Sequence, residues 1–384
     1  MMSVLLRVAS LWPRHFGADG RVLNLIAATF AWPTIFAGQL TGAGMSTFTA
    51  GVFGNDFDQL DIGSLVFGQV SNASSTGFTI GLNGQNDTFT GSGFSFGANG
   101  FPNAGMINSI EETYFGTRVY TLSGLQVSTT TFFGWAAADD NATAKLTIMG
   151  GGDIVSGSET SDRLRGYAGA DTINAGGGAD VADGGDGDDQ VFGGGGADVI
   201  VDPSGTNYLR GEEGDDHILG GTGFDDANGN MGNDTISGGP GDDYSVGGKD
   251  NDLLFGDAGQ DIVWGNLGND TCDGGDGNDQ VRGGQGDDSV SGGAGNDFVS
   301  GDRGNDTISG GTGADNFHGS QDAGIDRVVD FSLAQGDRVQ LDPGTIYTLN
   351  QVGPDTVLDM GNGHQMILMG VSMSSLTAGS IFFG

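Results

Sequence analysis

Cysteine, histidine and basic residues are scarce in this sequence of 384 residues. It holds one Cys, four His and 13 Lys plus Arg, against 50 Asp plus Glu, which gives a formal net charge of −37. The single Cys272 allows no intramolecular disulfide, so rigidity must have another source. With so few cationic groups to replace the counterions condensed on phosphates, nucleic acid is excluded as a partner. No stretch reaches the roughly 18 to 20 apolar residues of a membrane span. A multivalent cation is the natural partner of such a charge.

Glycine and aspartate are abundant, and they recur at a fixed period. From Gly157 to His318 a nine-residue unit repeats eighteen times without insertion or deletion, and three clean copies, GGQGDDSVS, GGAGNDFVS and GDRGNDTIS, run from Gly283 to Ser309. Positions 1 and 4 are each Gly in sixteen copies, position 6 is Asp in seventeen, and position 8 is apolar in all but one. A disordered polyanion has no reason to keep an apolar residue at every ninth position. The repeat therefore predicts equivalent units in a stacked structure.

The nonapeptide predicts the shape of each unit. Its glycines permit the positive φ values of a tight turn, and its last three residues, centred on the apolar one, form a short strand. Two copies make one 18-residue coil with a turn on each side. Nine coils stacked at ~4.8 Å would give a rod of about 43 Å. The expected fold class is all-β, a parallel β-roll solenoid of GGxGxDxUx repeats with a small N-terminal β domain and a C-terminal β cap.

The carboxylates at position 6 are the candidate metal ligands. Turns of alternate copies lie above one another, so these side chains form two columns, in which like charges about 5 Å apart repel unless a cation lies between them. Six or more carboxylate and carbonyl oxygens select calcium, and the repeat lacks the imidazole and thiolate ligands of zinc or copper sites. Each column has eight gaps, hence about sixteen potential Ca²⁺ sites, with those near the irregular Asp202–Asn207 copy the weakest. The predicted ligands are Asp162, Asp171, Asp180, Asp189, Asp198, Asp216, Asp225, Asp234, Asp243, Asp252, Asp261, Asp270, Asp279, Asp288, Asp297, Asp306 and Asp315.

At these residues the chain resembles the RTX (repeats-in-toxin, hemolysin-type) family, whose nonapeptide is GGxGxDxUx with U apolar. The resemblance covers residues 157–318 and, less specifically, continues through the segment DRVVDF at Asp326 to Phe331. It implies a calcium-loaded β-roll, secretion, and export by a type I system that reads an uncleaved C-terminal signal. Extracellular calcium modules bind at roughly 10⁻⁴ to 10⁻³ M, so we expect an array that folds on extracellular calcium.

Three segments flank or precede the array. Residues 1–44 read either as an export signal or as a misassigned start before Met45; the late apolar run from Val22 to Ala37, interrupted by Asn24 and Pro33, favours the second. Residues 45–150 carry alternating runs and turn signals of a small antiparallel sheet domain of unknown role. Residues 319–384 are expected to form a β cap that holds the secretion signal, with a hairpin at Gly361-Asn362-Gly363.

We find no convincing catalytic constellation. Gly93 to Gly97 matches G-x-S-x-G around Ser95, but no helix pattern follows it and no His occurs between His15 and His217. We interpret the carboxylate pairs Glu111-Glu112 and Asp139-Asp140 as solvated loop residues. The expected protein is therefore a non-enzymatic, secreted calcium-binding protein with a cell-surface or matrix/adhesion role. Its other partners would be the secretion machinery and an extracellular ligand, with a glycan as one candidate. The alternative is a small hydrolase or carbohydrate-active enzyme with its site in residues 45–150.

Overall fold

The computed structural model describes residues 47–50, 69–82, 85–97, 101–114, 117–138 and 149–384. The predicted leader or misassigned start, residues 1–44, lies outside these residues, as do Met45 and the pair Asp139-Asp140.

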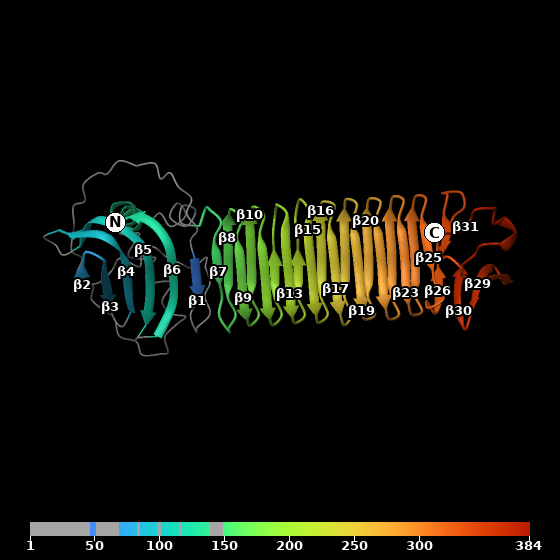
Figure 1. Ribbon diagram of the computed structural model, residues 1–384, viewed down its shortest axis with the longest axis horizontal. Helices are drawn as coiled ribbons and strands as arrows, with labels where there is room; N and C mark the ends of the chain where they lie inside the picture. The colour runs from blue at the N-terminus through green and yellow to red at the C-terminus, as the bar shows by residue number, and fades with distance from the viewer. Residues whose placement is uncertain (1–46, 51–68, 83–84, 98–100, 115–116, 139–148) are drawn as a thin grey trace, which may run out of the picture. The chain divides into compact units, whose positions relative to one another are not determined.

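Consecutive strands of the array alternate between two sheets (Figure 1). The strands within each sheet are parallel to one another. Partners in each sheet lie 18 residues apart, as Val263 and Val281 do, so two repeats form one coil. This confirms the predicted parallel β-roll. The first sheet contains β7 (Ile154–Ser156), β9 (Thr172–Gly177), β11 (Gln190–Gly195), β13 (Asn207–Glu213), β15 (Asp225–Met231), β17 (Tyr244–Lys249), β19 (Ile262–Leu267), β21 (Gln280–Gln285), β23 (Phe298–Arg303), β25 (Asn316–Gly319), β27 (Arg338–Leu341) and β31 (Ile381–Phe383). The second contains β8 (Arg163–Ala168), β10 (Val181–Asp186), β12 (Val199–Val201), β14 (His217–Leu219), β16 (Thr235–Pro240), β18 (Leu253–Ala258), β20 (Thr271–Asp276), β22 (Ser289–Ala294), β24 (Thr307–Thr312) and β26 (Ile325–Val328).

Most roll strands are longer than the three residues that we predicted. They have six residues, because positions 2 and 3 of the next repeat resume pairing after position 1, as Gly284 does with Asn266. Position 2 takes a left-handed conformation, with φ of 76° at Asn266. Pro203 occupies that position in its copy and cannot adopt a positive φ. The strand before it, β12, is accordingly limited to three residues.

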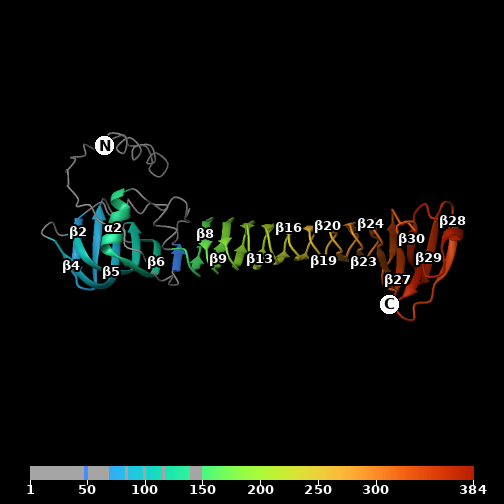
Figure 2. The ribbon, with the colours of Figure 1, turned by 90° about the horizontal axis from the view of Figure 1, so that it is seen from above.

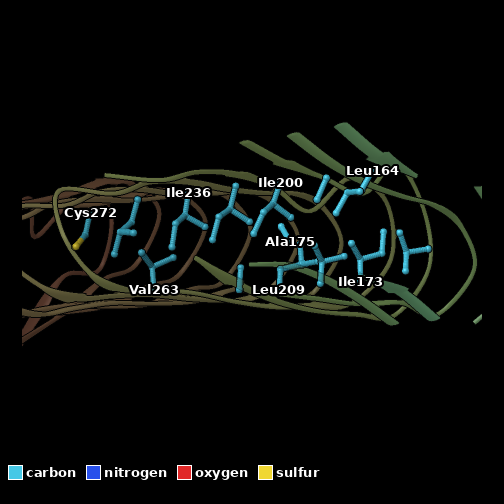
Figure 3. Packing of buried hydrophobic residues seen from close by; sticks show 14 of the residues in the cluster. Leu164, Ile173, Ala175, Ile200, Leu209, Ile236, Val263 and Cys272 are labelled. Carbon is cyan, nitrogen blue, oxygen red and sulfur yellow. The ribbon is translucent and has the colours of Figure 1, made fainter. Parts of the chain in front are cut away.

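The core of the roll is the single apolar residue at position 8 of each repeat. Strand geometry points these side chains between the two sheets, where Leu164, Ile236 and Val263 are fully buried (Figure 3). Cys272 fills one of these positions as a free buried thiol. Ser245, the one polar exception, is also buried, and its hydroxyl has no hydrogen-bond partner. Each repeat thus buries only one core side chain, which explains why the fold needs stabilisation from its turns.

The N-terminal part is an antiparallel sheet covered by a helix (Figure 2). Helix α2 (Thr129–Ala138) was not expected from the sequence. It begins after Ser128, whose hydroxyl accepts a hydrogen bond from the Thr131 N–H, and Phe132 packs edge-on against Phe89. The strands are β1 (Thr47–Ala50), β2 (Gln69–Ser74), β3 (Gly77–Leu82), β4 (Gln85–Phe96), β5 (Pro102–Tyr114) and β6 (Thr117–Ser128). Strand β1 pairs with β6 and also with β7 of the roll.

The C-terminal segment closes the roll. β26 and β27 continue the two sheets, and β31 adds to β27. The predicted hairpin is present, since β29 (Asp355–Gly361) and β30 (His364–Leu368) pair across a turn with positive φ at Asn362 and Gly363. β28 (Thr348–Val352) adds to β29, and one 3-10 turn, η4, spans Met373–Ser375. These strands cover the apolar edge that a solenoid otherwise exposes.

Candidate metal centre

The position-6 aspartates form two continuous columns. From Asp162 to Asp297, the backbone N–H of each position-6 residue donates to Oδ1 of the residue 18 positions later, over 2.7 to 3.2 Å. All seventeen predicted ligands are at most 4% exposed. The structure therefore brings them together as predicted, one per turn, and holds each carboxylate by one of its two oxygens.

The second oxygen of these carboxylates is the distinctive feature of the site. From Asp171 to Asp315, every predicted ligand has its Oδ2 buried and without a hydrogen-bond donor. At the array's first turn, Asp162 Oδ2 instead accepts bonds from the N–H and hydroxyl of Ser158. A buried carboxylate oxygen without a partner is costly. Repeating that arrangement along both columns points to a positively charged ligand.

The electrostatics of the columns also favour a positively charged ligand. Burial raises the pKa of Asp252 to about 8; the hydrogen bond from the Asp234 N–H opposes this rise, and the charges of Asp234 and Asp270 add to it. Burial likewise raises the pKa of Asp288 to about 7. A cation beside these oxygens would favour the ionised carboxylates and remove the repulsion between turns.

At position 1 a carboxylate oxygen and a backbone carbonyl oxygen converge. A Cβ added to Gly292 would lie 2.6 Å from Asp297 Oδ2 and 2.7 Å from the carbonyl oxygen of Gly310 in the next coil, and Gly220 repeats this arrangement with Asp225 and Gly238. In the described residues, no three His, Cys, Asp or Glu side chains converge as a metal-binding group. Backbone carbonyls must therefore supply much of a ligand shell, which favours calcium, with its 2.3 to 2.6 Å oxygen contacts.

Three aspartates outside the predicted set extend the columns. Asp153 belongs at the start of one column, because its backbone N–H donates to Asp171 Oδ1. At the other end, Asp326 and Asp337 accept the N–H groups of Asp306 and Asp315. The sequence carried a signal for each: Gly151 and Val155 keep repeat spacing around Asp153, and Asp-Arg-Val occurs at both Asp326 and Asp337.

The irregular copy retains a carboxylate from another position. Asn207 Oδ1 accepts the Asp189 N–H as an aspartate would, but its amide nitrogen is buried without a partner. Asp202, at position 1 of the same copy, is fully buried. Burial, and next the charge of Asp189, raise its pKa to about 9, with a smaller contribution from Asp225. The acid missing at position 6 is therefore replaced by one at position 1, which sequence reasoning missed.

The candidate catalytic residues that the structure describes outside the array lie in strands of the N-terminal sheet. Ser95 lies within strand β4, exposed, and donates to Asn103 Oδ1, rather than standing at a strand-to-helix turn. Our interpretation of Glu111-Glu112 as loop residues is wrong: both belong to strand β5. Glu112 is the cross-strand neighbour of Asp87, a 2% exposed residue.

Comparison with known proteins agrees with this geometry. The family model of the RTX calcium-binding nonapeptide repeat, which spans four copies, matches six overlapping or adjoining segments: 148–182, 168–200, 204–236, 237–272, 273–308 and 291–325. The first match begins at the turn that holds Asp153, and the last reaches the segment before Asp326. No curated protein matches the chain. The repeats of residues 148–325 therefore belong to the RTX calcium-binding nonapeptide family.

Proposed function

We propose that this protein is secreted, that its β-roll folds when it meets extracellular calcium, and that the folded roll serves a non-enzymatic cell-surface or matrix role. The observation that carries the calcium-dependent step is the pair of columns in which carboxylate oxygens are buried without donors. Without a cation the folded state must bury these oxygens without a compensating charge or donor. The core offsets little of that cost, because each repeat contributes only one buried apolar side chain. Cation binding would then decide whether the roll folds.

Each residue type has a defined part in this switch. The Oδ1 atoms hold the turns in register through N–H groups of the neighbouring coil. The Oδ2 atoms and the position-1 carbonyl oxygens would hold calcium, which supplies positive charge at that point. At about tenfold above its dissociation constant, each site contributes about 1.4 kcal/mol. Several such contributions together exceed the typical margin of stability of a domain.

Secretion and export rest on the family likeness. RTX repeats imply an exported protein, and a chain that cannot fold in low calcium suits passage through a narrow type I exporter. Among the described residues, no helix is long and apolar enough to cross a membrane. Residues 339–384, which contain no Lys or Arg, are the segment that we assign to the exporter.

Far-UV circular dichroism of the full chain, titrated with calcium and then with excess chelator, tests the switch. We expect a strand signal that develops with calcium, reverses with chelator, and is not restored by equal magnesium. A strand signal unchanged by chelator would contradict the proposal. Export is tested separately, by expressing the chain with and without residues 339–384 in a host that has a type I system.

One observation favours a second function, an enzyme site in residues 45–150. Burial raises the pKa of Asp87 to about 8, with the Glu112 charge adding to the shift and a hydrogen bond from Gln85 opposing it. A carboxyl group that holds its proton near neutral pH, with a second carboxyl group on the facing strand, suits general acid catalysis of hydrolysis. An esterase and glycan-hydrolysis screen of the full chain with calcium, repeated with Asp87→Asn, tests this candidate. Activity abolished by Asp87→Asn would replace the non-enzymatic proposal.

A further inference from the structure

The outward face of the first roll sheet carries a row of aromatic side chains. Positions 7 and 9 flank the buried position 8, so their side chains point away from the core. We call this surface the aromatic face. Its rings are those of Phe192, Tyr208, Tyr244, Trp264 and Phe298.

The aromatic face has no counterpart on the second sheet. There, positions 7 and 9 of the repeats carry one Phe, Phe255, and no Tyr or Trp. Aromatic residues favour strands in general, but that preference would act equally on both sheets, because their strands have the same geometry. The asymmetry therefore needs a reason specific to this face, and recognition of a ligand is such a reason.

Charged groups accompany the rings. The Arg210 guanidinium lies 3.5 Å from the Tyr208 ring centroid and pairs with Asp226 at 2.9 Å. Further along, the Arg282 guanidinium lies 5.2 Å from the Phe298 ring, and its Nη1 is 3.6 Å from Asp302 Oδ1. The two guanidinium groups thus lie over the rings of Tyr208 and Phe298, each paired with an aspartate, and these contacts leave the face of the Trp264 ring without a guanidinium over it.

The platform is hollowed at Trp264. A depression of about 350 Å³ is lined by Trp264, Asn266, Arg282, Gly283, Gly284 and Asp302. Trp264 and Arg282 are direct neighbours across the strands, and Tyr244 supports the indole edge-on at 5.2 Å. The indole Nε1 of Trp264 and the Nε of Arg282 are both buried without an acceptor. Each of these donors would gain a sugar hydroxyl oxygen as acceptor when its side chain turns toward the depression.

We propose that this depression and the aromatic face bind a neutral glycan. The apolar C–H face of a sugar ring stacks on an aromatic ring, whose face is electronegative. Amide, carboxylate and guanidinium groups at the rim, here from Asn266, Asp302 and Arg282, bond neighbouring sugar hydroxyls. The two arginines beside these rings are each paired with an aspartate, so an anionic polysaccharide would meet no net positive charge from them. A protein partner would require a more continuous apolar centre than rings separated by Asn, Gln and Arg.

This binding rests on the proposed function, since the face exists only in the folded roll. The full chain in saturating calcium is tested by native affinity electrophoresis in gels that contain soluble β-glucan, xyloglucan or galactomannan, with hyaluronan as the anionic comparison. At least one neutral polysaccharide should retard the protein. Trp264→Ala should weaken that binding about tenfold, and Arg282→Gln should weaken it as well. The matched control is Phe255→Ala, which removes a ring at position 9 of the opposite sheet.

Calcium-dependent circular dichroism of each variant separates binding from folding. If Trp264→Ala does not fold, binding by the Arg282→Gln variant tests the proposal, because Arg282 is half-buried on the outward face and not part of the core. The glycan proposal is overturned if no neutral polysaccharide retards the folded protein, if hyaluronan alone does, or if Phe255→Ala reduces binding as much as Trp264→Ala. A chain that fails to respond to calcium would instead contradict the proposed folding switch.

Discussion

The backbone N–H of Asp279 donates to Oδ1 of Asp297 over 2.9 Å, while Asp297 Oδ2 is buried with no donor. One carboxylate thus has two separate tasks. Its first oxygen fixes the register between coils, and its second is left for a cation. Because the same relation recurs 18 residues apart through both columns, register and cation binding depend on the same side chains.

Asp288→Asn should separate these tasks. Asparagine keeps an acceptor for the Asp270 N–H, which Asp288 Oδ1 now receives at 2.8 Å, but it places an amide where Oδ2 was. We expect the loss of at least one calcium site, or about 1.4 kcal/mol of unfolding free energy at calcium about tenfold above the dissociation constant. Urea unfolding measures it. Asp276→Asn, which removes the same charge from an exposed position, is the control and should change little; equal effects would argue against ligation by Asp288.

Gly292→Ala should weaken calcium binding through space alone. The added methyl would enter the gap between Asp297 Oδ2 and the Gly310 carbonyl oxygen. We expect a higher calcium midpoint in a circular dichroism titration, with no change in charge to account for it. Gly195→Ala is the control, since a Cβ at Gly195 meets nothing within 4 Å. A normal midpoint for Gly292→Ala would mean that the gap is not a ligand site.

The irregular copy offers a compensation test. Asp202→Gly removes the buried acid beside Asp189 and should lower stability in calcium. Adding Asn207→Asp to that variant returns the acid to position 6 and should restore most of the loss. Asn207→Asp alone places a second acid near Asp202 and should increase the calcium needed for folding. Additive effects of the two substitutions would contradict a shared site.

Asp87→Asn should raise thermal stability in a pH-dependent way. Burial raises the folded-state pKa of Asp87 from 3.8 to about 8. Between these values the folded state holds a proton that the unfolded state releases, so stability falls as pH rises. Asparagine has no such dependence. The melting temperature of the Asp87→Asn variant, measured in saturating calcium, should exceed that of the unsubstituted protein by little at pH 4 and by an increasing amount up to pH 8.

Glu111→Gln, an exposed change in the neighbouring strand, controls for simple removal of a negative charge. A melting-temperature difference for Asp87→Asn that is the same at pH 4 and pH 8 would show that Asp87 ionises normally in the folded protein.

Periodicity explains why so much of this fold could be predicted. Units that repeat every nine residues without interruption must occupy equivalent places, so Asp at position 6 and an apolar residue at position 8 predict both the columns and the core. The prediction was incomplete where the spacing changes. Asp326 follows Asp306 by 20 residues and Asp337 follows Asp315 by 22, yet both join the columns, because inserted residues can loop out while the turns stay stacked.

The all-β class, the 18-residue coil and the carboxylate columns follow from the sequence, because they depend on local spacing alone. Which distant side chains share an environment follows only from the folded stack. The structure places Asp202 beside Asp189, Asp87 opposite Glu112, and the Trp264 indole next to Arg282. Burial and pairing depend on the whole stack of strands, whereas turn and strand preferences are set within a few residues.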